Sequence, residues 1–170
     1  AYNNLGELAF TSGDANKAET FFKKAASIKA DAPEVNANLA LCELVKGNVA
    51  SAEALLGKAN GANAVNEALG NLYIKQGQYD RAVATFGDVK TNSAAQAQIL
   101  AKDYNKAKAT LAAVKNPDAM TDYLMAIVGA RTNNASLVSS SIKSAIAKDP
   151  SMAVKAANDR EFAKFASSIK

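Results

Sequence analysis

The stretch EALGNLYIKQGQYDRAVATFGDV, residues 67–89, decides the fold class of this 170-residue chain. Its first half, EALGNLYI, places apolar residues at the spacing of a helix and not of a strand. Gly77 follows, and glycine ends a helix at little cost because it adopts left-handed backbone freely. The small residue Gly70 stands beside Leu69, at a point where a second helix could approach closely. The stretch therefore predicts two short helices joined by a glycine turn.

The same pattern recurs five times along the chain. Each occurrence begins with a pair of residues at the same place, a large one followed by a small one except in the fourth, where both are alanine: Leu5-Gly6, Leu39-Ala40, Leu69-Gly70, Ala94-Ala95 and Met125-Ala126. A small or branched residue, a bulky residue and a last small residue follow: Ala18, Phe22 and Ala25; Ala52, Leu56 and Ala59; Ala82, Phe86 and Val89; Ala107, Leu111 and Val114; Val138, Ile142 and Ala145. All four series step by 34, 30, 25 and 31 residues, so the chain is an internal repeat.

This pattern resembles the tetratricopeptide repeat, a helical hairpin of about 34 residues with these marks in this order. The best match is residues 67–89. The first occurrence, NNLGELAFTSGDANKAETFFKKA at residues 3–25, is nearly as good, and the other three are degenerate. The resemblance implies an all-α fold, a right-handed α-α superhelix of about five helix pairs over residues 1–150. The expected units are about 1–32, 33–62, 63–90, 91–116 and 117–150, followed by capping helices at 151–170.

Local signals refine this expectation. Gly13, Gly47 and Gly77 occupy the same turn of the first three units, where Lys102 and Asn133 stand later. Asn116-Pro117 reads as the N-cap and first helical residue of the fifth unit, and Asp149-Pro150 as its end. The capping helices would bury their apolar residues against the last unit; these are Met152, Val154, Phe162 and Phe165.

Composition excludes several kinds of chemistry. The chain has 38 alanines, no histidine and one cysteine, so a Cys/His zinc site and a histidine-dependent triad or dyad lack their residues. Cys42 lies in an apolar helical stretch and is expected in the core. The carboxylates at turns are interpreted as helix caps and not as an acid-base pair; these are Asp14, Asp80, Asp103 and Asp149. We therefore expect no enzyme activity, no cofactor and no metal.

Charge and hydropathy limit the partners. The net charge is +4, but the basic residues are scattered and do not form the stripe or cluster interleaved with aromatics that is usual in nucleic-acid-binding proteins, so no nucleic-acid partner is expected. No apolar run approaches the roughly 18 residues of a membrane-spanning helix. The sequence begins inside a helical pattern at Ala1 with no cap before it, from which we expect further chain upstream.

The resemblance places function in a concave groove lined by the first helix of each unit, here called helix A, where peptides or helices bind. The residues expected to line it are Asn3, Asn4, Glu7, Asn38, Leu41, Glu67, Asn71, Lys75, Gln96, Tyr123, Ile127 and Arg131. Tyr123, Leu124, Ile127 and Arg131 would form its anchor patch, because tyrosine and arginine are frequent anchors. The alternative is that Phe162 and Phe165 of the C-terminal helices cover this patch.

Two further expectations concern the ligand and its setting. Asn3, Glu7, Ala64 and Ala68 replace the lysine, asparagine and arginine with which chaperone adaptors hold a C-terminal carboxylate, so an acidic chaperone tail is not expected. The leading hypothesis is a non-catalytic scaffold that binds an unidentified protein or peptide. The alternative is a module that binds a small ligand or a glycan such as a peptidoglycan fragment. The second half is similar to the C-terminal repeat region of large envelope lipoproteins of Gram-negative anaerobes, which implies a periplasmic or outer-membrane setting, with the cytoplasm as the alternative.

Overall fold

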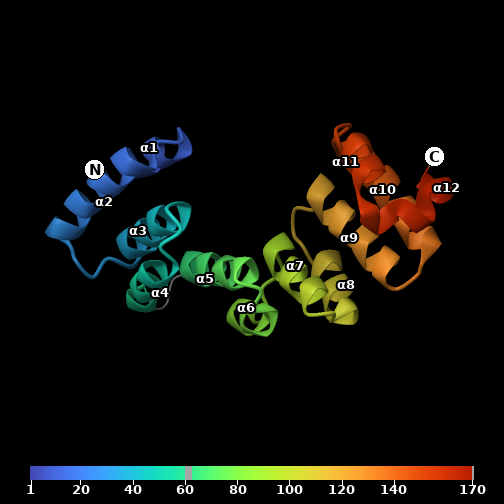
Figure 1. Cartoon of the computed structure of the whole chain (residues 1–170), viewed down its shortest axis with the longest axis horizontal. Coiled ribbons are helices and arrows are strands. Elements are labelled where there is room, and N and C mark those ends of the chain that lie inside the picture. The colour runs from blue at the N-terminus through green and yellow to red at the C-terminus, as the bar shows by residue number, and fades with distance from the viewer. Residues whose placement is uncertain (60–62, 170) are drawn as a thin grey trace. The chain divides into compact units, whose positions relative to one another are not determined.

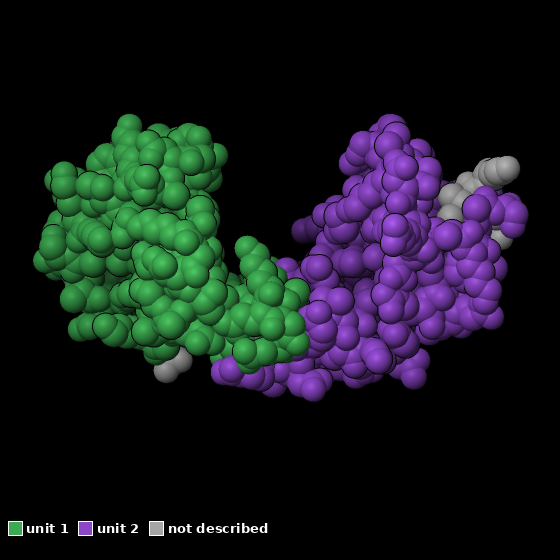
Figure 2. Space-filling model, viewed as in Figure 1, with its two compact units in different colours: residues 1–78 green, residues 79–170 purple. Residues whose placement is uncertain are grey.

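The computed structural model describes residues 1–59 and 63–169, and every regular element in these ranges is a helix (Figure 1). The chain divides into two compact units, residues 1–78 and 79–170 (Figure 2). The first contains α1 (Tyr2–Thr11), α2 (Ala15–Ile28), α3 (Pro33–Val45), α4 (Val49–Lys58) and α5 (Asn63–Lys75). The second contains α6 (Tyr79–Phe86), α7 (Asn92–Leu100), α8 (Tyr104–Ala112), α9 (Ala119–Arg131), α10 (Ala135–Lys148), α11 (Met152–Asn158), the 3-10 helix η1 (Arg160–Phe165) and α12 (Ala166–Ile169).

Consecutive helices pack as hairpins, as the repeat predicts. In the first unit α1 packs against α2 and α3 against α4, and α5 contacts both α3 and α4. In the second unit α7 packs against α8 and α9 against α10, while α6 packs against α7. The expected all-helical solenoid is therefore confirmed. The division into compact units falls between α5 and α6, the two helices of the expected repeat 63–90, and the expected boundary at 62 lies among residues 60–62, outside the described ranges.

Two of the repeated positions are buried in the second helix of every unit. The small residues Ala18, Ala52, Ala82, Ala107 and Val138 are all 0% exposed. The bulky residues that follow them are at most 3% exposed; these are Phe22, Leu56, Phe86, Leu111 and Ile142. The last position varies: Val89 is exposed, because α6 already ends at Phe86 and Gly87 turns the chain with a φ of 57°. The register read from the sequence is thus confirmed at these two positions of the second helix in all five units, whereas Leu5 of the first large-small pair is 44% exposed.

Two kinds of small residue fix the hairpin geometry. Gly6 is buried, and an added Cβ there would lie 2.8 Å from Cζ of Phe22 and closer still to the adjacent ring atoms. The turn glycines Gly13, Gly47 and Gly77 have φ values of 87°, 82° and 72°. Lys102 and Asn133 adopt the same left-handed backbone at φ values of 65° and 54°, which confirms that they occupy the turn position of later units.

Helix starts agree with the sequence in part. Asp14 and Asp103 are N-caps, since their carboxylates accept the N–H of Lys17 at 2.9 Å and of Lys106 at 3.1 Å. The expected start of the fifth unit at Asn116-Pro117 is wrong. There α9 begins at Ala119 with Asp118 as N-cap, because Asp118 accepts the Thr121 N–H at 2.8 Å while Thr121 Oγ1 accepts the Asp118 N–H at 3.1 Å. This reciprocal pair satisfies two backbone donors at once.

Candidate functional site

Three of the expected groove residues meet on the helix A surface of the first compact unit. Asn38 Nδ2 on α3 donates to Asn3 Oδ1 on α1 at 3.0 Å and to Glu7 Oε1 at 3.2 Å. Asn3 Nδ2 also donates to Glu7 Oε1 at 2.7 Å. Glu7 is exposed, and Asn3 and Asn38 are half-buried. We call this group the Asn3–Glu7–Asn38 cluster; it joins two consecutive helices A that the sequence separates by about 30 residues.

The row of helices A continues through α5, which contacts α3. Along this row Asn4, Glu67 and Lys75 are exposed, and Leu41 and Asn71 are half-buried. The surface carries amide and carboxylate groups beside an aliphatic side chain. Amide side chains offer both donors and acceptors, which is what an extended peptide backbone presents in return.

The accessible anchor patch expected around Tyr123 is absent from the described structure. Tyr123 is 2% exposed and Leu124 7%. The Tyr123 hydroxyl donates to Asp159 Oδ2 at 2.6 Å, and its ring meets the Phe162 ring edge-on, with centroids 5.5 Å apart and an interplanar angle of 89°. Burial and the hydrogen bond to Asp159 raise the pKa of the Tyr123 phenol. The structure therefore agrees with the alternative stated from the sequence, in which residues of the C-terminal helices cover Tyr123.

Arg131 is engaged by the same part of the chain. Its Nε donates to Glu161 Oε2 at 2.7 Å, and its terminal nitrogen donates to the other oxygen of Glu161, which makes a bidentate pair. Ile127 is half-buried and packs against the core of the last hairpin. Gln96 on α7 is exposed. Residues 159–165, here called the C-terminal segment, thus occupy the face of α9 that the repeat pattern predicts to be open.

The hydrophobic cap is built mostly from the residues expected for it. Phe162, Phe165 and Met152 are buried at 2%, 6% and 9% exposure. Val154 is 68% exposed, so the expectation that it covers the last unit is wrong; Ala156 takes that role at 2%. Asp159 and Glu161 are not among the residues predicted from the sequence; two acids within the three residues before Phe162 are the signal that points to partners for Tyr123 and Arg131.

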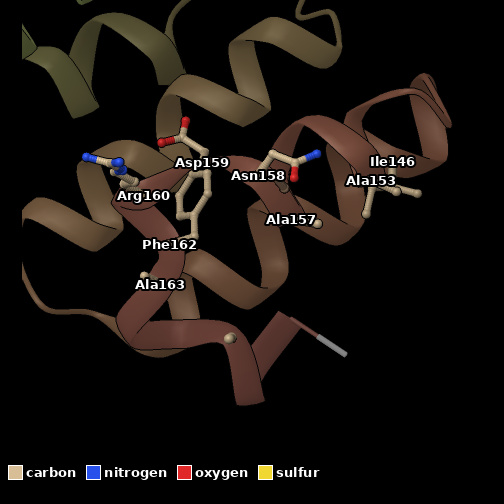
Figure 3. Close-up of a pocket in the computed structure, with 10 residues that line it drawn as sticks. Ile146, Ala153, Ala157, Asn158, Asp159, Arg160, Phe162 and Ala163 are labelled. Carbon is tan, nitrogen blue, oxygen red and sulfur yellow. The ribbon is translucent and has the colours of Figure 1, made fainter.

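A cavity of about 460 Å³ lies on the capping region (Figure 3). Its lining is mainly apolar and comes from α10, α11 and η1, including Ile146, Ala153 and Phe162. In Figure 3 the Phe162 ring points toward Asp159, whose carboxylate accepts the hydrogen bond from the Tyr123 hydroxyl. Alanine and aliphatic walls suit an alkyl or aromatic group better than a sugar.

Cys42 lies in the core at 0% exposure, as expected. Burial raises the pKa of its thiol, and the nearby Glu19 carboxylate adds to the effect. The described residues contain no group of three or more acidic or cysteine side chains placed to hold a metal ion. Within residues 1–59 and 63–169, no helix is long and apolar enough to cross a membrane.

Comparison with known proteins gives two sequence matches to tetratricopeptide repeat profiles, over residues 9–68 and residues 64–90. A search of curated protein sequences gives no match. Among solved structures, the chain is similar to TTC0263, a thermophilic TPR protein of Thermus thermophilus, with 16% identity, a TM-score of 0.69, and 99% of this chain and 97% of that chain covered.

Two further solved structures share the architecture. YrrB, described as a TPR protein with an unusual peptide-binding site, is 19% identical with a TM-score of 0.63, covering 93% of this chain and 91% of its own. The APC/C hetero-tetramer Cut9–Hcn1 is 12% identical with a TM-score of 0.57, covering 99% of this chain and 42% of that one. At these identities the likeness shows a shared fold.

Proposed function

We propose that this chain, whose solenoid fold and repeat profiles support membership of the tetratricopeptide repeat family, is a non-catalytic scaffold that binds a peptide or helix of another protein. The proposal places the ligand on the helix A row of the first compact unit. The observation that carries it is the Asn3–Glu7–Asn38 cluster, in which three side chains expected to line the groove meet across two helices at the surface.

The cluster is suited to this role because all three of its side chains lie at or near the surface. Glu7 accepts from two amides, so the carboxylate is held in place without being buried. A peptide backbone can replace either amide contact, since Asn side chains donate and accept in the same geometry as peptide groups. The neighbouring Leu41 and Asn71 extend the surface along α3 and α5. Tetratricopeptide repeat proteins generally act as interaction scaffolds. The structural neighbours include a protein described as having a peptide-binding site and a hetero-tetrameric assembly.

Two parts of the proposal rest on the sequence. The absence of histidine removes the most common general base, which supports a non-catalytic role. A periplasmic or outer-membrane setting is supported by sequence resemblance only, and detection of the native protein in fractionated cells would test it. The alternative, a module that binds a small ligand or glycan, would use the same amide-rich groove; the cavity of the capping region does not add support for it, because its walls are mainly apolar.

The experiment is selection of binding peptides from a random library displayed on phage, using the full chain as bait. Enriched peptides are then synthesised and titrated against wild type, Asn38→Ala and Asn16→Ala. Asn16 is an exposed asparagine on α2, outside the helix A row, and serves as the matched control. We expect Asn38→Ala to weaken binding about tenfold, or about 1.4 kcal/mol, and Asn16→Ala to leave it unchanged. Peptides that bind Asn38→Ala as tightly as wild type would contradict the proposed site.

A further inference from the structure

Three residues of the C-terminal segment contact α9, each through a different type of interaction. Asp159 accepts from the Tyr123 hydroxyl, Glu161 holds Arg131 through two oxygens, and Phe162 packs edge-on against the Tyr123 ring. We infer that residues 159–165 are an intramolecular ligand, and that the face of α9 they cover recognises a partner segment of the same acidic-aromatic chemistry once they leave.

The chemistry of the seated segment defines the chemistry of the partner. A phenol and a guanidinium on one helix face each select a carboxylate, and a bidentate guanidinium adds directional specificity. The two carboxylates belong to residues 159 and 161, and the aromatic ring follows at 162. The surface therefore fits a short segment of the pattern Asp-x-Glu-Phe. Lys164 adds a fourth contact, since its Nζ donates to Asn133 Oδ1 at 2.8 Å.

The segment is held by a mixture of strong and weak contacts. Phe162 and Phe165 are buried in the same apolar core as Val138 and Ile142, which keeps the segment in place in the isolated chain. The Arg131 and Glu161 side chains are 43% and 31% exposed, so water competes for that pair. Residues 160–165 of the segment form a six-residue 3-10 helix, a conformation with poorer hydrogen-bond geometry than the α-helices that it contacts. These features allow local opening while α9 and α10 stay folded.

Because the C-terminal segment belongs to the same chain, it keeps this face of α9 covered when no partner is bound. A ligand tethered by a short connection has an effective concentration in the millimolar range, so a free peptide of equal affinity competes poorly with it. Weakening the anchors of the segment should therefore open the surface, whereas removing Arg131 should damage the surface itself. The inference does not rest on the Asn3–Glu7–Asn38 cluster, which lies in the other compact unit.

The test is the binding of a fluorescent peptide, NDREFAKFAS, with the sequence of residues 158–167, to three full-length chains. These are wild type, a double variant Glu161→Ala and Phe162→Ala, and the same double variant with Arg131→Ala added. We expect the double variant to bind at least tenfold more tightly than wild type, and the added Arg131→Ala to reverse at least tenfold of that gain. A peptide of the same composition in scrambled order is the control. Equal binding of both peptides to the double variant would overturn the inference.

A second measurement applies to the wild-type chain and does not depend on the variants folding. The Phe162 N–H is bonded to the Asp159 carbonyl at 3.1 Å and the Glu161 N–H to the Asp159 carboxylate at 2.9 Å. If the segment opens locally, these amides exchange with deuterium at least tenfold faster than the core amides of α9 and α10. Exchange as slow as that of the α9 core would show that the segment leaves α9 only when the second compact unit unfolds, and would overturn the inference.

Discussion

Gly6 lies beneath the ring of Phe22, and the absence of a side chain there sets the spacing of α1 and α2. Gly6→Ala adds a methyl group that overlaps the ring. We expect a loss of about 1–3 kcal/mol in the free energy of unfolding, although alanine is the better helix former. The matched control is Gly57→Ala on α4, where an added Cβ meets nothing within 4 Å and where we expect a gain of up to about 1 kcal/mol. Urea unfolding of both variants checks this; Gly6→Ala at wild-type stability would show that the α1–α2 contact is misplaced.

Tyr123 gives a prediction about pH. Its pKa is raised in the folded protein by burial and by Asp159, so the folded state favours the neutral phenol. The stabilisation is fully present below the ordinary phenol pKa of about 10 and is lost as the pH rises above it, because only the unfolded chain then ionises this group. We therefore expect the melting temperature to fall more steeply from about pH 10 upward in wild type than in Tyr123→Phe. Parallel curves for the two proteins would contradict this placement of the hydroxyl.

At the scale of the helix, the start of α9 shows where sequence rules compete. Asn116-Pro117 and Asp118 both satisfy the preferences for a helix start, and only the reciprocal bonds between Asp118 and Thr121 decide in favour of the second. We expect Asp118→Ala to cost about 1 kcal/mol and Asn116→Ala less than about 0.5 kcal/mol of unfolding free energy. Thermal or urea unfolding measures both, and equal effects would favour a helix start at Asn116.

The capping helices show a second limit. Met152 and Ala156 are four residues apart and lie on one face of α11, whereas Val154, two residues on, points to the other side. Hydrophobicity alone predicts that Val154 is the buried residue, but the helical period places Ala156 on the buried face instead. The polar contacts of Asp159 and Glu161 with α9 could not be derived from the repeat pattern, because residues 159–165 lie beyond it and follow no repeat register.

At the scale of the whole molecule, the repeat predicted the four hairpins that lie within the compact units, α1–α2, α3–α4, α7–α8 and α9–α10, because the residues that pack within each lie close together in the sequence. Ala18 with Phe22 and Val138 with Ile142 obey one rule at opposite ends of the chain. The meeting of Asn3 and Glu7 with Asn38 follows from a second property of the repeat: consecutive helices A contact one another, although Asn3 and Asn38 lie 35 residues apart. The covered state of Tyr123 did not follow from the repeat, because the residues that cover it belong to the C-terminal segment, which carries no repeat position; Asp159 lies 36 residues after Tyr123, about as far as Asn38 lies after Asn3. Nor does any repeat signal mark the division between residues 78 and 79.

The central claim is that a partner peptide binds the helix A row of the first compact unit. The most direct test is a two-dimensional ¹H–¹⁵N NMR titration of the full chain with a peptide selected by phage display. We predict that the side-chain amide signals of Asn3 and Asn38 shift with saturation, together with backbone amides of α1 and α3. The same titration with Asn38→Ala should require about tenfold more peptide. Saturable shifts confined to α2 and α4, with the Asn3 and Asn38 signals unmoved, would contradict the claim.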